Sequence, residues 1–303
     1  GERNMIEIKN LHYSYGKITA LRGINLAANS GEITAIIGAN GAGKTTTFRM
    51  IIGLLDKTSG TITLDGKPID YTQTDKIGFL TEERSLLLKL TVLEQAIYYG
   101  VLKGMSESAV EKKLDELLER FNIKEYKNRK LKELSKGNQQ KVQFITAIIN
   151  DPKLLILDEP FSGLDPINVQ LFMDVIMDLK KKGTSIIFSS HRMEHVELFC
   201  EKLVILVHGK PVLQGYLKDI KKQYRKKNIH IIGDVDIKSL EQIDGVLKVT
   251  SNPEEIIVQI ASDDKAKNVF KYITTCKNIT KFDVEDATLN EIFIEKVGEA
   301  YEK

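Results

Sequence analysis

The stretch GANGAGKTT, Gly38 to Thr46, decides the fold of this chain. It crowds three glycines around one lysine, directly after the apolar run ITAII. Glycine allows tight loops whose successive main-chain N–H groups point inward, and such a loop cradles phosphate oxygens. The fixed positions of the motif G-x-x-x-x-G-K-[ST] are filled by Gly38, Gly43, Lys44 and Thr45. In this motif the lysine reaches the β- and γ-phosphates, and the threonine hydroxyl binds Mg²⁺.

The residues on both sides favour a phosphate site over a glycine-rich turn beside a stray lysine. Glu32 to Ile37 has the apolar run of a buried strand, and TTTFRMIIGLL has the apolar spacing of a helix. Phosphates would then lie at a helix N-terminus, where the helix dipole favours anions. The residues predicted to bind nucleotide here are Gly38, Asn40, Gly41, Gly43, Lys44, Thr45 and Thr46.

Length and composition indicate a soluble globular protein with two domains. The chain has 303 residues, of which 42% are hydrophobic and 28% charged. Its apolar runs are all much shorter than 18 residues, so no span of a membrane is expected. The net charge of +2 is too balanced to indicate nucleic acid over the whole chain. Cys200 and Cys276 form no recognisable metal or disulfide framework, which suits a reducing cytosol.

Apolar strands alternate with helices along most of the chain, and this order predicts a parallel sheet covered on both faces. A mostly helical segment is expected from Thr91 to Asn150. The expected strands are Met5–Asn10, Ile24–Ala28, the segment GTITLDGKPI with its Asp-Gly turn, KIGFL, Lys153–Asp158, Thr184–Ser190 and Lys202–Leu206.

The composition of the sequence changes near Leu217, where basic residues become frequent. The basic stretch LKDIKKQYRKKN fits either a solvated helix or linker at a domain boundary, or a surface for nucleic acid or anionic membranes. The segments beyond it predict the β-α-β-β-α-β order of ferredoxin-like domains. They are Ile229–Gly233, Ile237–Gln242, Val246–Thr250, Glu255–Ile260, Lys265–Thr275 and Asn278–Val284, with a closing helix over Thr288–Val297.

Three further groups of residues complete a candidate site. Asp158 and Glu159 end an apolar strand, where open α/β sheets bind ligands. Asp158 can hold Mg²⁺ directly or through water, and Glu159 can polarise a water for attack on a γ-phosphate. By itself such an acidic pair can also cap a helix. His191 ends another strand and could reach the same edge, although a lone histidine is more often a satisfied surface or core residue.

The segment ELSKGNQQ provides a second phosphate-facing helix N-terminus, with Ser135, Gly137 and Asn138 just before the helix. Taken with the phosphate loop, LILDEP, SGLDP and SSH, in this order and spacing, it resembles the ATP-binding cassette (ABC) ATPases over roughly Met5 to Gly215. In that family two cassettes sandwich two ATP molecules head to tail, so the resemblance implies that Ser135, Gly137 and Asn138 complete the site of a second subunit.

The resemblance also implies a fold and several residue roles. The fold is a phosphate-loop α/β core with an antiparallel β-subdomain over residues 5–220, and a helical subdomain at about 85–150. A small α+β domain follows at 228–303. Lys44, Glu159 and His191 would be catalytic, with His191 touching the γ-phosphate. Asp165 would link the two sites. Tyr15, with Tyr13 as the alternative, would stack on adenine.

This sequence departs from the family pattern at three positions. Lys136 replaces the first glycine of L-S-G-G-Q, and Asn138 replaces its glutamine. Lys136 either points toward the partner's nucleotide or stays solvated. Glu82 stands where most members carry glutamine. Its carboxylate can bind Mg²⁺, as Thr45 and Asp158 are expected to, but it adds negative charge near the phosphates.

EERSLLLKLTVLEQ, LSKGNQQK and the ending ATLNEIFIEKVG resemble the sodium- or drug-export (Nat-like) subgroup. The implied function is ATP hydrolysis by an exporter subunit at the cytoplasmic face of the membrane. It would pair with a second cassette and a separate membrane-spanning permease, without nucleic acid.

The apolar segment Leu86–Gly104 either docks that permease or forms an ordinary subdomain core. Two other functions remain: a soluble ABC ATPase acting on nucleic acid or ribosomes, and a regulatory module without turnover. The single cassette and the lack of heptads count against the first, and Glu159 and His191 count against the second.

Overall fold

The computed structural model describes residues 5–69, 71–82 and 86–301. Its contacts divide the chain into two compact units, Gly1–Gln214 and Gly215–Lys303. The sequence places the end of the first domain at residue 220 and the start of the second at 228. In the structure the two units meet between Gln214 and Gly215, so helix α7 (Leu217–Gln223) groups with the C-terminal unit.

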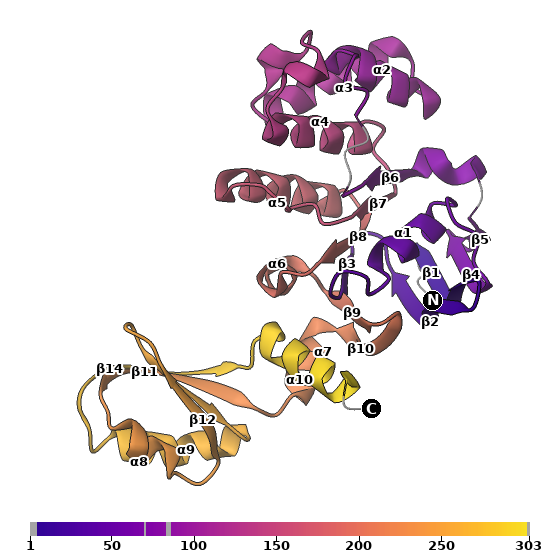
Figure 1. The fold of residues 1–303 in the computed structure, drawn as a ribbon. Helices are drawn as coiled ribbons and strands as arrows, with labels where there is room; N and C mark the ends of the chain where they lie inside the picture. Colours follow the sequence, from indigo (N-terminus) through magenta and orange to yellow (C-terminus); the bar gives the residue numbers. More distant parts are fainter. Residues whose placement is uncertain (1–4, 70, 83–85, 302–303) are drawn as a thin grey trace. The chain divides into compact units, whose positions relative to one another are not determined.

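A six-stranded sheet forms the centre of the N-terminal unit (Figure 1), in the order β10-β9-β3-β8-β7-β6. β3 pairs in parallel with β8 and β9, and β7 pairs in parallel with β6 and β8. Every residue of β3, β7 and β8 is buried, as expected for strands covered on both faces. The strands are β3 (Ile33–Ile37), β6 (Ile77–Leu80), β7 (Leu154–Leu157), β8 (Ser185–Ser190), β9 (Lys202–Val207) and β10 (Lys210–Tyr216).

The sequence prediction missed strand β10. The segment KPVLQGY contains Pro211 and Gly215, which both weaken a strand pattern. The structure resolves this conflict by placing β10 at the end of the sheet, where a proline costs little because one side of the strand is unpaired.

The antiparallel sheet has the order β2-β1-β4-β5. Its strands are β1 (Ile6–Tyr15), β2 (Ile18–Ala28), β4 (Ser59–Leu64) and β5 (Lys67–Pro68). The predicted strands ending at Asn10 and beginning at Ile24 are too short, because β1 and β2 continue as a hairpin in which Tyr15 pairs with Ile18. Irregularities in the register between Ile8 and Ser14 break the alternation of apolar and polar residues, so the pattern does not reveal the outer half.

Helices α2, α3 and α4 gather at one end of the N-terminal unit (Figure 1) and form the predicted helical subdomain. α2 begins with a capping box between Thr91 and Glu94, and Ser106 caps α3. Edge-to-face and tilted contacts among the aromatic rings of Phe121, Phe144 and Phe172 join the end of α3 and α4 to α5. The helices of this unit are α1 (Lys44–Ile51), α2 (Val92–Leu102), α3 (Glu107–Arg120), α4 (Lys136–Ile148), α5 (Pro166–Lys181) and α6 (Met193–Phe199), with 3-10 turns at Tyr71–Lys76, Lys124–Tyr126 and Leu131–Glu133.

The C-terminal unit has the predicted β-α-β-β-α-β order. Its four strands form an antiparallel sheet in the order β12-β13-β11-β14, with its apolar core on the face toward α8 and α9. The elements are β11 (Lys227–Asp234), α8 (Ile237–Glu241), β12 (Val246–Ser251), β13 (Ile256–Ile260), a 3-10 turn at Asp263–Lys265, α9 (Ala266–Ile273), β14 (Lys277–Asp286) and α10 (Leu289–Tyr301).

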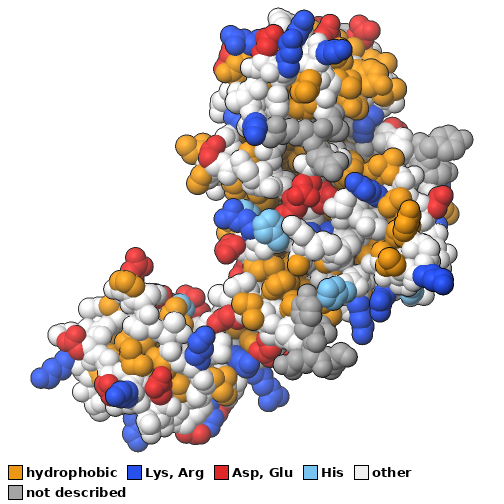
Figure 2. Space-filling model, viewed as in Figure 1, with side chains coloured by type: hydrophobic (Ala, Val, Ile, Leu, Met, Phe, Trp, Pro, Cys, Tyr) orange, Lys and Arg blue, Asp and Glu red, His pale blue; other side chains and the backbone are white. Residues whose placement is uncertain are grey.

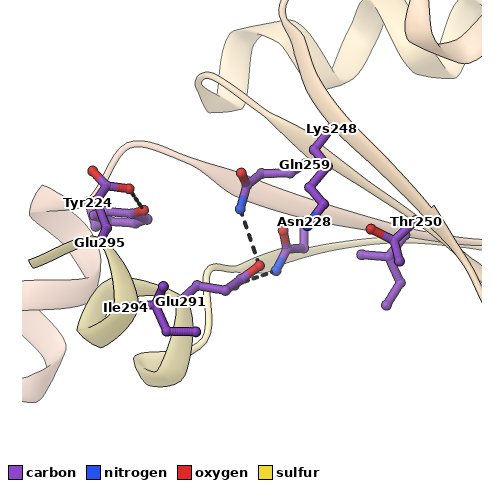
Figure 3. Close-up of a pocket in the computed structure, with 9 residues that line it drawn as sticks. Tyr224, Asn228, Lys248, Thr250, Gln259, Glu291, Ile294 and Glu295 are labelled. Carbon is purple, nitrogen blue, oxygen red and sulfur yellow. Dashed lines mark hydrogen bonds between the residues drawn. The ribbon is translucent and has the colours of Figure 1, made fainter. Parts of the chain in front are cut away.

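Polar contacts fasten α10 to this unit. Figure 3 shows the amides of Asn228 and Gln259 pointing at Glu291, at hydrogen-bond distances of 2.8 and 3.2 Å. These residues border a pocket of about 270 Å³. Two lysines from the basic stretch, Lys226 and Lys227, form ion pairs with Glu295 and Asp286. This part of the basic stretch therefore has partners within the chain. Among the described residues, no helix is long and apolar enough to cross a membrane.

Candidate nucleotide site

The phosphate loop is folded so tightly that two of its positions accept only glycine. A Cβ on Gly38 would lie 2.7 Å from the Ala42 Cβ and 2.8 Å from the Leu206 carbonyl oxygen. Gly43 has φ +103°, and a Cβ there would lie 2.5 Å from a methyl carbon of Leu21. Gly43 caps α1 without a side-chain hydrogen bond, so the first turn of that helix faces the loop with its N–H groups available to an anion.

Lys44 lies inside this loop, with 6% of its surface exposed. Its ammonium donates to the carbonyl oxygens of Gly38 at 2.6 Å and Ala39 at 3.3 Å. The same ammonium lies 3.6 Å from Oε1 of Glu159. Loop carbonyls and one carboxylate therefore hold the cation at the position where the motif needs it to meet phosphates.

Strand register explains how distant motifs meet. In the parallel sheet Ile37 lies opposite Ser190, and Leu157 lies opposite Phe188. The residues that follow these strands therefore lie together at the C-terminal ends of the parallel strands, as the sequence predicts for Asp158 and His191.

Asp158 is held by two hydroxyl groups. Thr45 Oγ1 donates to Oδ2 at 2.8 Å, and Ser189 Oγ donates to Oδ1 at 2.6 Å. The Ser189 hydroxyl also accepts a hydrogen bond from the Glu159 main-chain N–H at 2.9 Å. Ser189 therefore orients both acidic residues. Sequence reasoning did not single it out, since only the register of β7 and β8 reveals its neighbours.

Glu159 adopts a left-handed backbone conformation, with φ +48°, which is uncommon for any residue other than glycine. Its side chain is 7% exposed. His191 Nδ1 lies 3.0 Å from Oε2, within hydrogen-bond distance. Oε1 accepts no hydrogen bond from the described residues. One oxygen of the proposed base is thus oriented, and the other is left for a ligand.

A pocket of about 220 Å³ lies over the loop. Residues of the phosphate loop line it together with the carboxylates of Glu82 and Glu159. The full lining is Asn40, Gly41, Ala42, Gly43, Lys44, Thr45, Thr46, Glu82 and Glu159. Glu82 therefore reaches the site from the end of β6. The Gln143 amide donates to the main-chain oxygen of Thr81 at 3.1 Å and supports that segment. Residues 83–85, part of the quoted EERSLL segment, lie outside the described residues.

The segment Leu134–Asn138, which we call the signature segment and which begins helix α4, the signature helix, does not line this pocket. Ser135 instead caps α4 by accepting from the Asn138 N–H at 3.3 Å, and it is exposed with Lys136. Gln140, one turn further along α4, donates to the carbonyl oxygens of Pro160 and Ser162, both at 3.2 Å. The signature helix is thus tied to the loop that follows Glu159, while its N-terminus stays open to an external ligand.

Tyr15 and Asp165 do not line the pocket either, nor do Gly38, Asp158 and His191. Tyr15 is 76% exposed at the hairpin, whereas Tyr13 packs against the apolar core, so Tyr15 is the ring available for stacking. Asp165 caps α5 by accepting from the N–H groups of Ile167 and Asn168, each at 3.0 Å. Hydrogen bonds from Asn168 hold the pKa of the Asp165 carboxyl below its ordinary value.

The fold and this site define a phosphate-loop ATPase with a cassette architecture. Comparison with known proteins gives its family. Residues 21–162 match the family described as ABC transporter, and residues 215–297 match the C-terminal domain of DrrA1-3-like ATP-binding proteins. The chain belongs to the ATP-binding proteins of ABC transporters, and it is an ATPase coupled to transport.

Individual relatives support this assignment. The chain is 48% identical over 298 residues to the ABC transporter ATP-binding protein YhaQ of Bacillus subtilis, covering 98% of this chain and 100% of YhaQ. It is 35% identical over 221 residues to NatA of the same organism, covering 71% and 89%. A solved structure of an ATP-binding subunit of an ABC transporter superposes with a TM-score of 0.69 at 33% identity, covering 73% and 93%.

Proposed function

We propose that this chain hydrolyses ATP through Glu159 and thereby drives a separate exporter protein in the membrane. Glu159 takes the proton of a water whose oxygen attacks the γ-phosphorus, and the bond to the bridging oxygen of ADP breaks. Lys44 neutralises phosphate charge, and His191 holds the base in position. The observation that carries this proposal is the buried Oε1 of Glu159, which accepts no hydrogen bond from the described residues and lies 3.6 Å from the Lys44 ammonium, at the pocket over the phosphate loop.

Mg²⁺ suits the oxygen atoms that surround the pocket. Thr45 and Asp158 present a hydroxyl and a carboxylate 2.8 Å apart, and Glu82 lines the same cavity. Mg²⁺ commonly takes one or two carboxylates together with substrate phosphates and water. These three residues would hold the ion, which supplies charge compensation for the phosphates when bound.

The exposed signature segment supports a head-to-tail dimer. Ser135 caps α4 and Gly137 lies in its first turn, yet neither residue lines the pocket over the phosphate loop. A second cassette would bring its γ-phosphate to these N–H groups, with Asn138 beside them. ATP would therefore join two cassettes, and hydrolysis would release them.

A groove beside α2 supports docking of the membrane partner at Leu86–Gly104. Its volume is about 580 Å³. Figure 2 shows hydrophobic side chains gathered over α2, where Tyr98, Val101 and Leu102 are exposed. We call this cavity the docking groove; it is lined by Ile52, Leu54, Thr74, Ile77, Phe79, Thr81, Gln95, Tyr99, Leu102, Lys103, Gln143, Thr146 and Ala147.

The direction of transport is inferred from the resemblance to the sodium- or drug-export subgroup, supported by the likeness to NatA and to the DrrA1-3-like C-terminal domain. We place the chain at the cytoplasmic face of the membrane, bound to the permease. The C-terminal unit contains none of the phosphate-contacting motifs, and we assign it an accessory role.

Purification of the tagged protein from its native membranes tests this function. A polytopic membrane protein should accompany it in stoichiometric amount, and the complex should hydrolyse MgATP. Recovery with ribosomes or nucleic acid in place of a membrane protein would favour the soluble alternative and contradict the proposal.

A further inference from the structure

The pocket in the C-terminal unit contains a buried hydrogen-bond acceptor that the fold does not use. Asn228 borders this pocket and is 4% exposed, and its amide nitrogen donates to Glu291 at 2.8 Å. The amide oxygen, Oδ1, is buried and accepts no hydrogen bond within the part of the chain that the structure describes. A buried acceptor without a partner is unfavourable, and a ligand that donates to it removes that cost.

The strands place Asn228 in a row of side chains that ends in a lysine. Asn228 of β11 lies opposite Gln259 of β13, and Gln259 lies opposite Lys248 of β12. All three border the pocket (Figure 3), on the face of the sheet that points away from the apolar core. Neighbouring strands lie about 4.8 Å apart, so the Cα atoms of Asn228 and Lys248 are roughly 10 Å apart. A lysine side chain is long enough to span much of that distance.

The charges around the pocket are only partly paired. Glu295 forms an ion pair with Lys226 at 2.6 Å. Glu291 and Lys248, by contrast, form no ion pair with any residue that the structure describes. Asn228 and Glu291 are hydrogen-bonded neighbours, so the unused acceptor lies beside a negative charge. The pocket therefore has a negative end at these two residues and a positive group at Lys248.

We propose that this pocket binds a small zwitterion, a molecule of the size of an amino acid that carries one ammonium and one carboxylate group. The ammonium donates to Oδ1 of Asn228 and lies in the field of the Glu291 carboxylate, and the ligand carboxylate pairs with Lys248. Charge-assisted hydrogen bonds at both ends favour such a ligand over a neutral one. A water molecule would satisfy Oδ1 but would bring no opposite charge to Glu291 or Lys248.

The size and walls of the pocket limit the ligand further. Its volume of about 270 Å³ is smaller than the roughly 300–1,000 Å³ of sites that hold drug-sized molecules. Ile257 from β13 and Ile294 from α10 form the apolar part of the lining, and Thr250 adds a hydroxyl group. An amino acid with a short aliphatic side chain fits these walls. Because they come from both the sheet and α10, the ligand would strengthen the contact between them.

Isothermal titration calorimetry on the full-length protein tests the proposal. The probes are the common amino acids at up to about 10 mM, with ethylamine and acetate as probes that carry only one of the two charges. An amino acid with a short aliphatic side chain should bind, one molecule per chain, at least about tenfold more tightly than ethylamine or acetate. Saturating ADP should not compete, because the phosphate loop belongs to the other unit.

Two results of this titration would overturn the proposal. The first is that none of the amino acids binds. The second is that ethylamine or acetate binds as tightly as the best amino acid, since the pocket would then recognise only one of the two charges.

Substitutions then locate the site. Lys248 is exposed, so Lys248→Gln should fold normally, and it should weaken binding of the amino acid about tenfold or more. Lys238→Gln is the matched control, because Lys238 is exposed in α8 and does not border the pocket. Asn228→Leu removes the acceptor with little change in volume and should abolish binding, with circular dichroism as the check that this variant folds. Unchanged binding by Lys248→Gln would contradict the proposal.

A crystal structure of the full-length protein with the bound amino acid gives a measurement that needs no substitution. The ligand nitrogen should lie within hydrogen-bond distance of Asn228 Oδ1. A ligand found elsewhere, or only water at Oδ1, would overturn the assignment.

Discussion

Glu159 in the N-terminal unit and Glu291 in the C-terminal unit both border pockets, but their oxygens are used differently. Glu291 Oε1 accepts from Gln259, and Oε2 accepts from Asn228 and from the N–H and hydroxyl of Thr288. Glu159 Oε2 faces His191, while Oε1 accepts no hydrogen bond from the described residues and lies near Lys44.

The difference distinguishes a structural carboxylate from the one that we propose as the catalytic base. Glu291 completes the capping box of α10, so its hydrogen bonds are made within the fold and leave nothing to a substrate. Glu159 has an uncommon left-handed backbone conformation, and its Oε1 accepts no hydrogen bond from the described residues, a condition expected where function outweighs local stability. Unused hydrogen-bonding capacity, more than burial and acidity alone, is therefore the ground on which we propose Glu159 as the base.

The largest effect should come from removing the base. Glu159→Gln should reduce the rate of ATP hydrolysis at least ~100-fold, since general-base steps contribute about 10² to 10⁴. MgATP binding should persist, because the phosphate loop is unchanged. Glu291→Gln is the matched control and should hydrolyse normally. Phosphate release and nucleotide binding by the purified proteins measure both, and near-normal turnover in Glu159→Gln would remove Glu159 from the mechanism.

Ser189 should matter next, as a positioning residue. Ser189→Ala removes the hydroxyl that orients Asp158 and the Glu159 main chain, so turnover should fall about tenfold, with a higher Mg²⁺ requirement. Ser185→Ala is the control, since Ser185 is equally buried in β8 but donates to the Asn29 carbonyl oxygen, remote from the pocket. Equal loss in both variants would indicate a general effect on β8.

The sequence predicts a site residue when that residue belongs to a local motif, and it misses a residue whose neighbours come from distant parts of the chain. Lys44, Asp158 and Glu159 were predicted because their roles follow from spacing along the chain. Ser189 was not, because its importance arises from the pairing of β7 with β8.

The fold follows the same rule. The parallel strands and the β-α-β-β-α-β order were predicted from apolar runs and turn residues. The outer hairpin of β1 and β2 was missed because its register is irregular, and β10 because an edge strand tolerates proline and glycine. Both features are established by the pairing of strands in the folded structure and not by the local sequence pattern.

Removing the structural carboxylate, Glu291, should lower stability without affecting ATP hydrolysis, the opposite of what we expect for Glu159. Glu291→Ala leaves the amides of Asn228 and Gln259 without their acceptor and should lower the stability of the C-terminal unit by about 1–3 kcal/mol. Basal ATPase activity should stay unchanged. Thermal unfolding by circular dichroism and a parallel hydrolysis assay measure the two effects. A loss of turnover with unaltered stability would reverse the roles assigned to the two carboxylates.

The smallest expected effect is a change in how the stability of the protein depends on pH. Hydrogen bonds from Lys226 and Tyr224 hold the pKa of Glu295 below its ordinary value of 4.5. A lowered carboxyl pKa stabilises the fold above the ordinary value, and this contribution is lost as pH falls through the lowered one. Glu295→Gln should therefore cost about 0.2–1 kcal/mol at pH 7 and progressively less below pH ~4.5. A difference from the unmodified protein that grows toward acid pH would contradict this sign.

The central claim is that the free oxygen of Glu159 and the open signature helix belong to one ATP site shared by two subunits. Light scattering on purified Glu159→Gln tests it most directly, with MgATP, with MgADP and in combination with Ser135→Arg. We expect dimers with MgATP, monomers with MgADP, and monomers throughout when Ser135→Arg is added. Dimers that form equally with ADP, or that survive Ser135→Arg, would contradict the shared site.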